Sequence, residues 1–173
     1  MLRPRIIPCL LVRNKGLVKT VKFGESKYVG DPINAVKIFN EKEVDELVVL
    51  DIDATAKGVE PNYEMIRNLA SECRMPLCYG GGVKSVEQAL KIVSLGVEKV
   101  ALSSAVVENP SLIADIAKRV GNQSVVAVLD VKKKRLWGRY EVYVNNGRKG
   151  TGKDPVALAH ELEQHGVGEI LIR

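Results

Sequence analysis

Residues 76–104 read PLCYGGGVKSVEQALKIVSLGVEKVALSS, and this stretch decides the fold. Its pattern predicts a short apolar strand, a turn of three glycines, an amphipathic helix, a buried strand over 97–102 and a small polar turn. Ser85 is the expected N-cap of the helix, and Gly96 is expected to end it. Two strands joined through a helix indicate a parallel sheet.

Small polar groups follow both of these predicted strands. Gly81 and Gly82 belong to the turn after the first strand, and Ser103 and Ser104 follow the second. The carboxyl ends of parallel strands share one edge of the sheet, where glycine amides, hydroxyls and helix N-termini favour anions. The residues leave two interpretations open: a phosphate site, or tight turns between closely packed elements.

The rest of the chain repeats this alternation of strands and helices. Further strands are expected at 5–12, 46–51, 124–131 and 169–173, and further helices at 31–44, 60–74, 109–120 and from residue 154 onwards. The segment 14–30 is expected to be a loop, whereas the segment after 131 is expected to form a β-hairpin that turns at Asn146-Gly147. This order predicts an α/β fold with a parallel sheet.

An internal repeat is also visible. DPINAVKIFNEKEVDELVVLD (31–51) aligns with DPVALAHELEQHGVGEILIR (154–173), and the preceding strands IIPCLLV and VVAVLDV align as well, so that Leu11 falls on Asp130. Such a period indicates half-barrel duplication. We therefore predict one domain over residues 1–173, a (βα)8 TIM-type barrel with about five and a half βα units here, strands seven and eight being absent.

Composition narrows the class of protein. With 46% hydrophobic and 27% charged residues, the chain has the composition of a soluble globular protein, and no apolar run reaches membrane-spanning length. The three cysteines, Cys9, Cys73 and Cys78, do not have the spacing of a zinc site, so reduced thiols in the cytoplasm are expected. We expect no metal, no cofactor and no membrane association.

The formal charge of +5 is concentrated in one segment, residues 132–153. This segment has one acid, Glu141, and eight basic side chains: Lys132, Lys133, Lys134, Arg135, Arg139, Arg148, Lys149 and Lys153. It contains no recognisable nucleic-acid-binding module, so no nucleic-acid partner is expected. A solvated hairpin and local attraction for a phosphorylated substrate remain equally open.

Several ordered blocks together resemble a known family: RIIPCLLV, GDPINAVKIFNEKEVDELVVLDID, GGGV, GVEKVALSSAVVENPSLI and SVVAVLDVKKK. They are similar to the cyclase subunit of imidazole glycerol phosphate synthase over nearly the whole chain. The resemblance implies a barrel enzyme of the carbon–nitrogen lyase class that needs no cofactor and forms a heterodimer with a glutaminase. With ammonia from that partner, it would convert a phosphoribulosyl aminoimidazole carboxamide into imidazole glycerol phosphate and aminoimidazole carboxamide ribotide, in histidine biosynthesis.

The resemblance also assigns roles to particular residues. Asp130, at the end of the fifth strand, is the expected general acid and base. The matching position on the first strand is Leu11, a departure from the family, because leucine cannot transfer a proton. Contacts to the phosphorylated substrate are implied for residues at strand ends and in the first loop: Lys19, Asp51, Gly81, Gly82, Ser103 and Ser104.

Four charged residues open strands at the opposite end: Arg5, Glu46, Lys99 and Glu169. Two positive and two negative side chains predict a neutral ring, because buried charges are costly unless they are paired. Such a ring can simply close the barrel floor. The resemblance implies that it is the gate through which ammonia enters.

A second resemblance offers a different function. The blocks CLLV, DIDAT and CYGGGV are similar to cyclase-like proteins of bacterial surface-polysaccharide pathways, which are thought to pass ammonia to a sugar-modifying amidotransferase. Two hypotheses follow. The chain is an ammonia-dependent cyclase, or it is a non-cyclising conduit subunit that docks a glutaminase at the ring.

Overall fold

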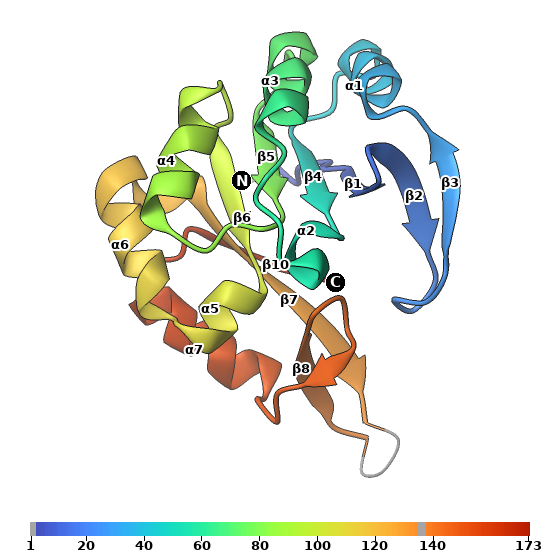
Figure 1. The fold of residues 1–173 in the computed structure, drawn as a ribbon. Coiled ribbons are helices and arrows are strands. Elements are labelled where there is room, and N and C mark those ends of the chain that lie inside the picture. Colours follow the sequence, from blue (N-terminus) through green and yellow to red (C-terminus); the bar gives the residue numbers. More distant parts are fainter. Residues whose placement is uncertain (1–2, 135–137) are drawn as a thin grey trace.

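The computed structural model describes residues 3–134 and 138–173. Six strands form a parallel sheet in the order of their appearance in the chain (Figure 1). They are β1 (Cys9–Arg13), β4 (Leu47–Asp51), β5 (Leu77–Gly80), β6 (Lys99–Leu102), β7 (Val125–Lys133) and β10 (Glu169–Ile172).

Helices connect each parallel strand to the next and cover the outer side of the sheet (Figure 1). They are α1 (Pro32–Glu41), α2 (Ala54–Lys57), α3 (Tyr63–Glu72), α4 (Val86–Ser94), α5 (Ser104–Glu108), α6 (Ser111–Val120) and α7 (Pro155–Gln164), with a 3₁₀ turn, η1 (Asn122–Ser124), before β7. Five βα units and a sixth strand are thus described, which confirms the predicted TIM-type α/β fold.

Two antiparallel hairpins extend the sheet. Strands β8 (Tyr140–Val144) and β9 (Lys149–Gly150) form the predicted hairpin after β7, with Gly147 at a left-handed φ of 69° in its turn. The prediction of a loop over 14–30 was wrong, because β2 (Gly16–Thr20) pairs with β1, and β3 (Ser26–Gly30) pairs with β2. Leu17 and Val18 are buried by this pairing, which explains why the segment becomes a hairpin.

The internal repeat is visible in the structure. Each half contains a strand, an antiparallel hairpin, a helix that begins Asp-Pro, and a second parallel strand. Asp31 caps α1 by accepting from the amide of Asn34 at 3.0 Å. Asp154 caps α7 by accepting from the amides of Val156 and Ala157 at 2.9 and 3.0 Å. The same cap thus sets the start of both helices.

The sheet has an apolar core on each side, since side chains alternate along a strand. An outer core lies between the sheet and the helices and includes Leu47, Val49, Ile66 and Ile92. The inner cluster lies on the concave side of the sheet. It consists of Val18, Val48, Leu50, Ile52, Cys78, Ala101, Val126 and Val128, with Ile7, Leu11 and Leu171 packed against it. Burial on both faces explains the nearly continuous apolar runs of these strands.

Some details differ from the sequence prediction. The short helices α2 and α5 were missed, because four or five residues show no periodicity. The expected cap at Ser85 is confirmed, since its hydroxyl accepts from the amide of Gln88 at 3.3 Å. Of the eight basic residues in the charged segment, Arg135 lies outside the described residues.

Within residues 3–134 and 138–173, no helix has the length and apolar character needed to cross a membrane. The same residues contain no group of three or more histidine, cysteine, aspartate or glutamate side chains placed to hold a metal ion.

Candidate functional site

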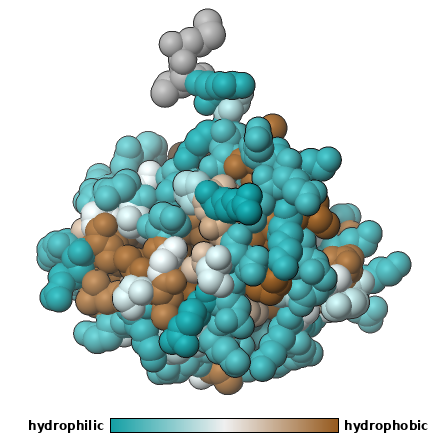
Figure 2. Space-filling model, turned by 90° about the horizontal axis from the view of Figure 1, so that it is seen from above, coloured by the Kyte–Doolittle hydropathy of each residue, from teal (hydrophilic) through white to brown (hydrophobic). Residues whose placement is uncertain are grey.

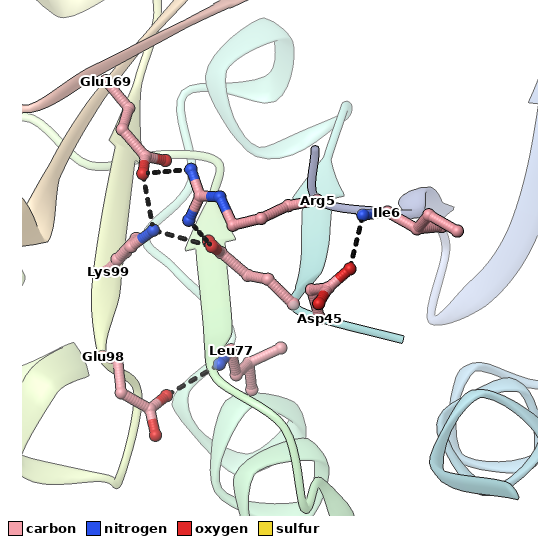
Figure 3. Close-up of polar contacts among 8 residues, drawn as sticks. Arg5, Ile6, Asp45, Leu77, Glu98, Lys99 and Glu169 are labelled. Carbon is pink, nitrogen blue, oxygen red and sulfur yellow. Dashed lines mark hydrogen bonds and ion pairs between the residues drawn. The ribbon is translucent and has the colours of Figure 1, made fainter. Parts of the chain in front are cut away.

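Four charged side chains close the end at which the parallel strands begin (Figure 3). Arg5 donates to Glu46 at 3.2 Å and to Glu169 at 2.7 Å. Lys99 donates to the same two carboxylates, at 2.7 Å to Glu46 and 2.9 Å to Glu169. The four residues therefore form the closed, neutral ring that the sequence predicted, and each is placed by the start of a different strand or by the segment before it.

Burial and pairing act in opposite directions on the charges of this ring. Burial lowers the pKa of Lys99, but its hydrogen bonds to Glu46 and Glu169 outweigh this and raise the pKa overall. Burial likewise raises the pKa of Glu169, and the opposing effect of Arg5 and Lys99 leaves it below its ordinary value. Both groups therefore stay charged at neutral pH, and the ring remains intact there.

Neighbouring carboxylates fix the backbone around the ring (Figure 3). Asp45 accepts from the amide of Ile6 at 2.6 Å, and Glu98 accepts from the amide of Leu77 at 2.7 Å. Figure 2 views the molecule from the end at which β4 and β5 begin, and shows a mainly hydrophilic surface with hydrophobic areas between the hydrophilic ones. The side chain of Arg5 is 49% exposed, so the ring can be reached from solvent.

An apolar layer follows the ring inside the curved sheet. It contains Val48, Cys78 and Val126, which are nearly or fully buried. Burial, and next to it the charge of Glu46, raises the pKa of the Cys78 thiol far above its ordinary value, so this side chain is neutral. An uncharged molecule can pass such a layer at much lower cost than an ion.

A cavity of about 400 Å³ lies at the other end, where the strands finish. Gly81 and Gly82 line it after β5, and Ser103 and Ser104 line it after β6. The structure thus brings together the four residues predicted for phosphate.

The glycine turn requires its glycines. Gly81 has a φ of 129°, and a Cβ there would lie 2.5 Å from the carbonyl oxygen of Asp51. Gly82 has a φ of 74°, and its amide donates to the hydroxyl of Thr55 at 3.4 Å. A side chain at either position would strain the turn that presents these backbone groups to the cavity.

Asp51 also lines the cavity, but it serves the local turn. One of its oxygens accepts from the amides of Asp53 and Ala54 at 2.9 and 3.1 Å. Burial raises the pKa of Asp51, and these two backbone bonds partly offset the rise. Its predicted contact with a substrate can involve its other oxygen.

Sequence reasoning missed the contribution of the second hairpin to the cavity. Asn145 and Asn146 line it from the turn between β8 and β9. The amide of Asn145 donates to the hydroxyl of Ser104 at 3.2 Å, and the side chain of Asn146 donates to the carbonyl of Ile52. The Asn-Asn-Gly sequence identified the turn, but nothing in it indicated what the turn would cover.

The predicted acid and base, Asp130, is 1% exposed and lies in a two-point ion pair. Arg173 donates to it from Nε at 2.9 Å and from Nη2 at 3.1 Å. Burial raises the pKa of Asp130, and the charge of Arg173 acts in the opposite direction. Arg173 was missed, although its position four residues after Glu169, on the same face of the strand, was a usable signal.

Two other predicted positions lie away from the cavity. Lys19 is exposed on β2, and it is not among the residues that line the cavity. Leu11 packs against the inner cluster. The basic segment is partly neutralised, since Lys134 pairs with Glu141 at 3.1 Å. Lys132 lies over the ring of Phe23, 5.0 Å from its centroid.

Comparison with known proteins places this arrangement in a family. The family described as histidine biosynthesis protein matches residues 5–173. A Leptospira borgpetersenii protein that carries the provisional name imidazole glycerol phosphate synthase subunit HisF is 58% identical over 99% of this chain and 68% of its own length. Its Vibrio vulnificus counterpart, provisionally named as subunit HisF3, is 59% identical over 99% of this chain and 66% of its own length.

Two relatives whose names lack the provisional wording are 41% and 42% identical to this chain. The imidazole glycerol phosphate synthase subunit HisF of Streptococcus mutans is 42% identical over 99% of this chain and 68% of its own length. The chain thus spans about two thirds of the length of these relatives. It belongs to the histidine biosynthesis protein family, among the HisF subunits of imidazole glycerol phosphate synthase.

Proposed function

We propose that this chain is the ammonia-using cyclase subunit of an imidazole glycerol phosphate synthase, a carbon–nitrogen lyase of histidine biosynthesis. The names of its relatives support this assignment. The observation that carries it is the position of the ring and the cavity at opposite ends of the same strands. Glu46 precedes β4 and Lys99 begins β6, whereas Asp51 and Ser103 lie where these strands end.

This arrangement suits the delivery of ammonia. A strand of four or five residues spans about 15 Å, which sets the length of the path from the ring to the cavity. The layer of Val48, Cys78 and Val126 along it favours neutral ammonia over ammonium. A glutaminase docked over the half-exposed Arg5 would release ammonia at the start of this path.

The cavity suits a phosphorylated small molecule. The hydroxyls of Ser103 and Ser104, beside the glycine turn, supply donors of the kind that bind phosphate oxygens. Ammonia that arrives through the ring would meet the ligand there. Three free cysteines fit a reducing compartment, so a cytoplasmic location is part of this proposal.

A second candidate function is a conduit that passes ammonia on without closing a ring. It is favoured by the residues at two matching positions of the repeat, one on β1 and one on β7. Leu11 has no group that can transfer a proton, and both oxygens of Asp130 are bound by Arg173. To act as a cyclase, the chain would need the ion pair between Asp130 and Arg173 to break during turnover, or it would need another group to transfer the protons.

Cyclisation with ammonium salts separates the two candidates. The full chain is supplied with the phosphoribulosyl substrate and ammonium, and imidazole glycerol phosphate is measured by mass spectrometry. Turnover by the wild type supports the cyclase. If the wild type shows no turnover, the variant Leu11→Asp is compared with the uncharged control Leu11→Asn. If only the aspartate variant gains turnover, the result supports a cyclase site that lacks only this acid. If neither variant gains turnover, the result supports the conduit.

A further inference from the structure

The two antiparallel hairpins concentrate the positive charge of the chain. Residues 14–30 and 132–153 contain twelve of the 26 basic residues but only two of the 21 acidic residues, Glu25 and Glu141. In the rest of the chain, 19 acidic residues outnumber 14 basic ones. The formal charge of +5 is therefore the difference between two strongly basic hairpins and an acidic remainder, and this separation gives the molecule a directed electric field.

Most of these basic side chains are exposed and have no carboxylate partner. The buried Glu141 pairs with Lys134 at 3.1 Å, and Lys153 pairs with Glu161 of α7 at 3.7 Å. Eight further bases of the hairpins are exposed and form no ion pair within residues 3–134 and 138–173. One is Lys19, for which a contact with the substrate is already predicted. The other seven are called the basic rim: Lys15, Lys22, Lys27, Lys133, Arg139, Arg148 and Lys149.

These charges do not stabilise the hairpins. In the register of β2 and β3, Lys27 lies directly opposite Lys19, and like charges in this position destabilise a pair of strands. Elsewhere the chain pairs its surface charges, as Lys118 does with Asp115 at 3.3 Å. An excess of one sign that costs stability is better explained by an interaction with an anion than by solvation of the hairpins.

The two hairpins meet beside the cavity (Figure 1). Phe23, in the turn between β2 and β3, lies under the Nζ of Lys132, which is 5.0 Å from the ring centroid. The same ring packs against the turn between β8 and β9, where a Cβ at Gly147 would lie 2.8 Å from it. Asn146, the residue before Gly147, lines the cavity. The point at which the hairpins touch is therefore next to the cavity.

Three members of the basic rim adjoin this point of contact. Lys22, Lys133 and Arg148 are each one position along the chain from a residue that meets there. One residue spans about 3.3 Å of a strand, so these charges lie within roughly 10–15 Å of the cavity. Charges are screened beyond about 30 Å at 10 mM ionic strength and beyond about 8 Å at 150 mM. At low ionic strength, the rim therefore acts on an anion before the anion reaches the cavity.

The cavity itself has little charge with which to attract a ligand. Its lining includes the cations of Lys84 and Arg173 and the carboxylates of Asp51 and Glu108, which balance one another. Attraction over a distance must therefore come from the hairpins around the cavity.

We propose that the basic rim steers anionic ligands into the cavity: it raises the rate constant of association and makes no contact with the bound ligand. The field of such a patch raises association rates by about 10- to 1,000-fold, and the effect falls steeply with ionic strength. The inference rests on the proposed binding of a phosphorylated ligand in this cavity, but it requires neither ammonia nor turnover.

Stopped-flow fluorescence tests the proposal, with the phosphoribulosyl substrate as the probe and without ammonia or glutaminase. The full chain is compared with a variant that carries Lys22→Gln, Lys133→Gln and Arg148→Gln. We expect the association rate constant to fall about tenfold at 10 mM ionic strength and less than about threefold at 150 mM, with the dissociation rate constant unchanged. A second variant, with glutamate at the same three positions, should associate more slowly still.

A matched control removes the same charge far from the hairpins. It carries Lys42→Gln, Arg67→Gln and Arg74→Gln, three exposed positions on or just after α1 and α3. Because these charges lie further from the cavity, we expect a change in the association rate constant of at most about twofold at 10 mM.

The two rate constants distinguish steering from the other roles of these bases. Equal association rate constants in the glutamine variant and the control would overturn the proposal, and so would a variant that changes only the dissociation rate constant, since that is the mark of a direct contact. Thermal unfolding checks the fold: the glutamine variant should melt no lower than the wild type, because it relieves repulsion. A lower melting temperature with unchanged association would assign these bases to the fold instead. If the wild type does not bind the substrate at all, the proposed function fails, and steering fails with it.

Discussion

Replacement of Lys99 by methionine is expected to destabilise the fold strongly, because Lys99 bridges the two carboxylates of the ring. Methionine keeps much of the length of the side chain but removes the charge. Glu46 is 3% exposed and would lose its shorter ion pair, 2.7 Å, while it keeps the 3.2 Å contact with Arg5. Glu169 would lose its contact of 2.9 Å.

The size of this effect follows from the burial of Glu46. Removal of one partner from a buried ion pair costs about 3–5 kcal/mol. Since Arg5 still pairs with both carboxylates, we expect about 2–3 kcal/mol for Lys99→Met. At about 2–4 °C per kcal/mol for a chain of this size, the melting temperature should fall by about 5–10 °C.

Urea and thermal unfolding followed by circular dichroism measure this loss. The matched control is Lys118→Met, because Lys118 pairs with Asp115 at 3.3 Å with both side chains mostly exposed. An exposed pair of this kind contributes about 0.5 kcal/mol or less. If Lys99→Met were no less stable than Lys118→Met, the reasoning that the ring is a buried, interdependent network would be refuted.

The effect should also depend on pH. The raised pKa of Lys99 contributes stability that is complete below the ordinary value of 10.5 and is lost as the pH rises through the folded value. The lowered pKa of Glu169 contributes stability that is present above 4.5 and is lost as the pH falls through the folded value. The difference between wild type and Lys99→Met should therefore narrow at both extremes.

Three further outcomes are expected. Gly81→Ala should weaken phosphate binding at least tenfold in calorimetry, because its Cβ would lie 2.5 Å from the carbonyl of Asp51; wild-type affinity would contradict the account of the turn. Asp154→Ala should cost about 1 kcal/mol in urea unfolding through loss of the α7 cap, and no change would refute that cap. In a variant that lacks Cys9 and Cys73, the thiol of Cys78 should react with a thiol reagent at pH 8 only after denaturation. The reason is that Cys78 is 0% exposed and that burial raises its pKa. Rapid reaction in the folded protein would contradict this burial.

The fold could be predicted from the sequence where the pattern is local. The glycine turn, the cap at Ser85 and the apolar strand before Ser103 define a βα unit without reference to the rest of the chain. The Asp-Pro starts of α1 and α7 revealed the repeat. The segment 14–30 could not be assigned in this way. Its strands β2 and β3 are stabilised by the pairing of β2 with β1 and of β3 with β2, and this tertiary interaction is not visible in a local sequence pattern of polar and glycine residues.

The site was predictable in part for the same reason. Residues that start or end a strand, such as Lys99 and Ser104, meet their counterparts on neighbouring strands as a consequence of the parallel topology. Arg173 and Asn145 were missed because their roles depend on side-chain direction and on a hairpin that reaches the cavity from a distant part of the sequence. The exposed position of Lys19 likewise depends on the β2–β3 hairpin, which the sequence did not predict.

The most direct test of the central claim, that ammonia passes through the ring to a ligand in the cavity, is an isotope competition. The full chain with a glutaminase subunit is supplied with the phosphoribulosyl substrate, glutamine labelled with ¹⁵N in its side-chain amide, and an excess of unlabelled ammonium. We predict that imidazole glycerol phosphate retains most of the ¹⁵N, because the ammonia does not mix with solvent. A product whose label is diluted in proportion to the external ammonium, or the absence of imidazole glycerol phosphate, would contradict the account.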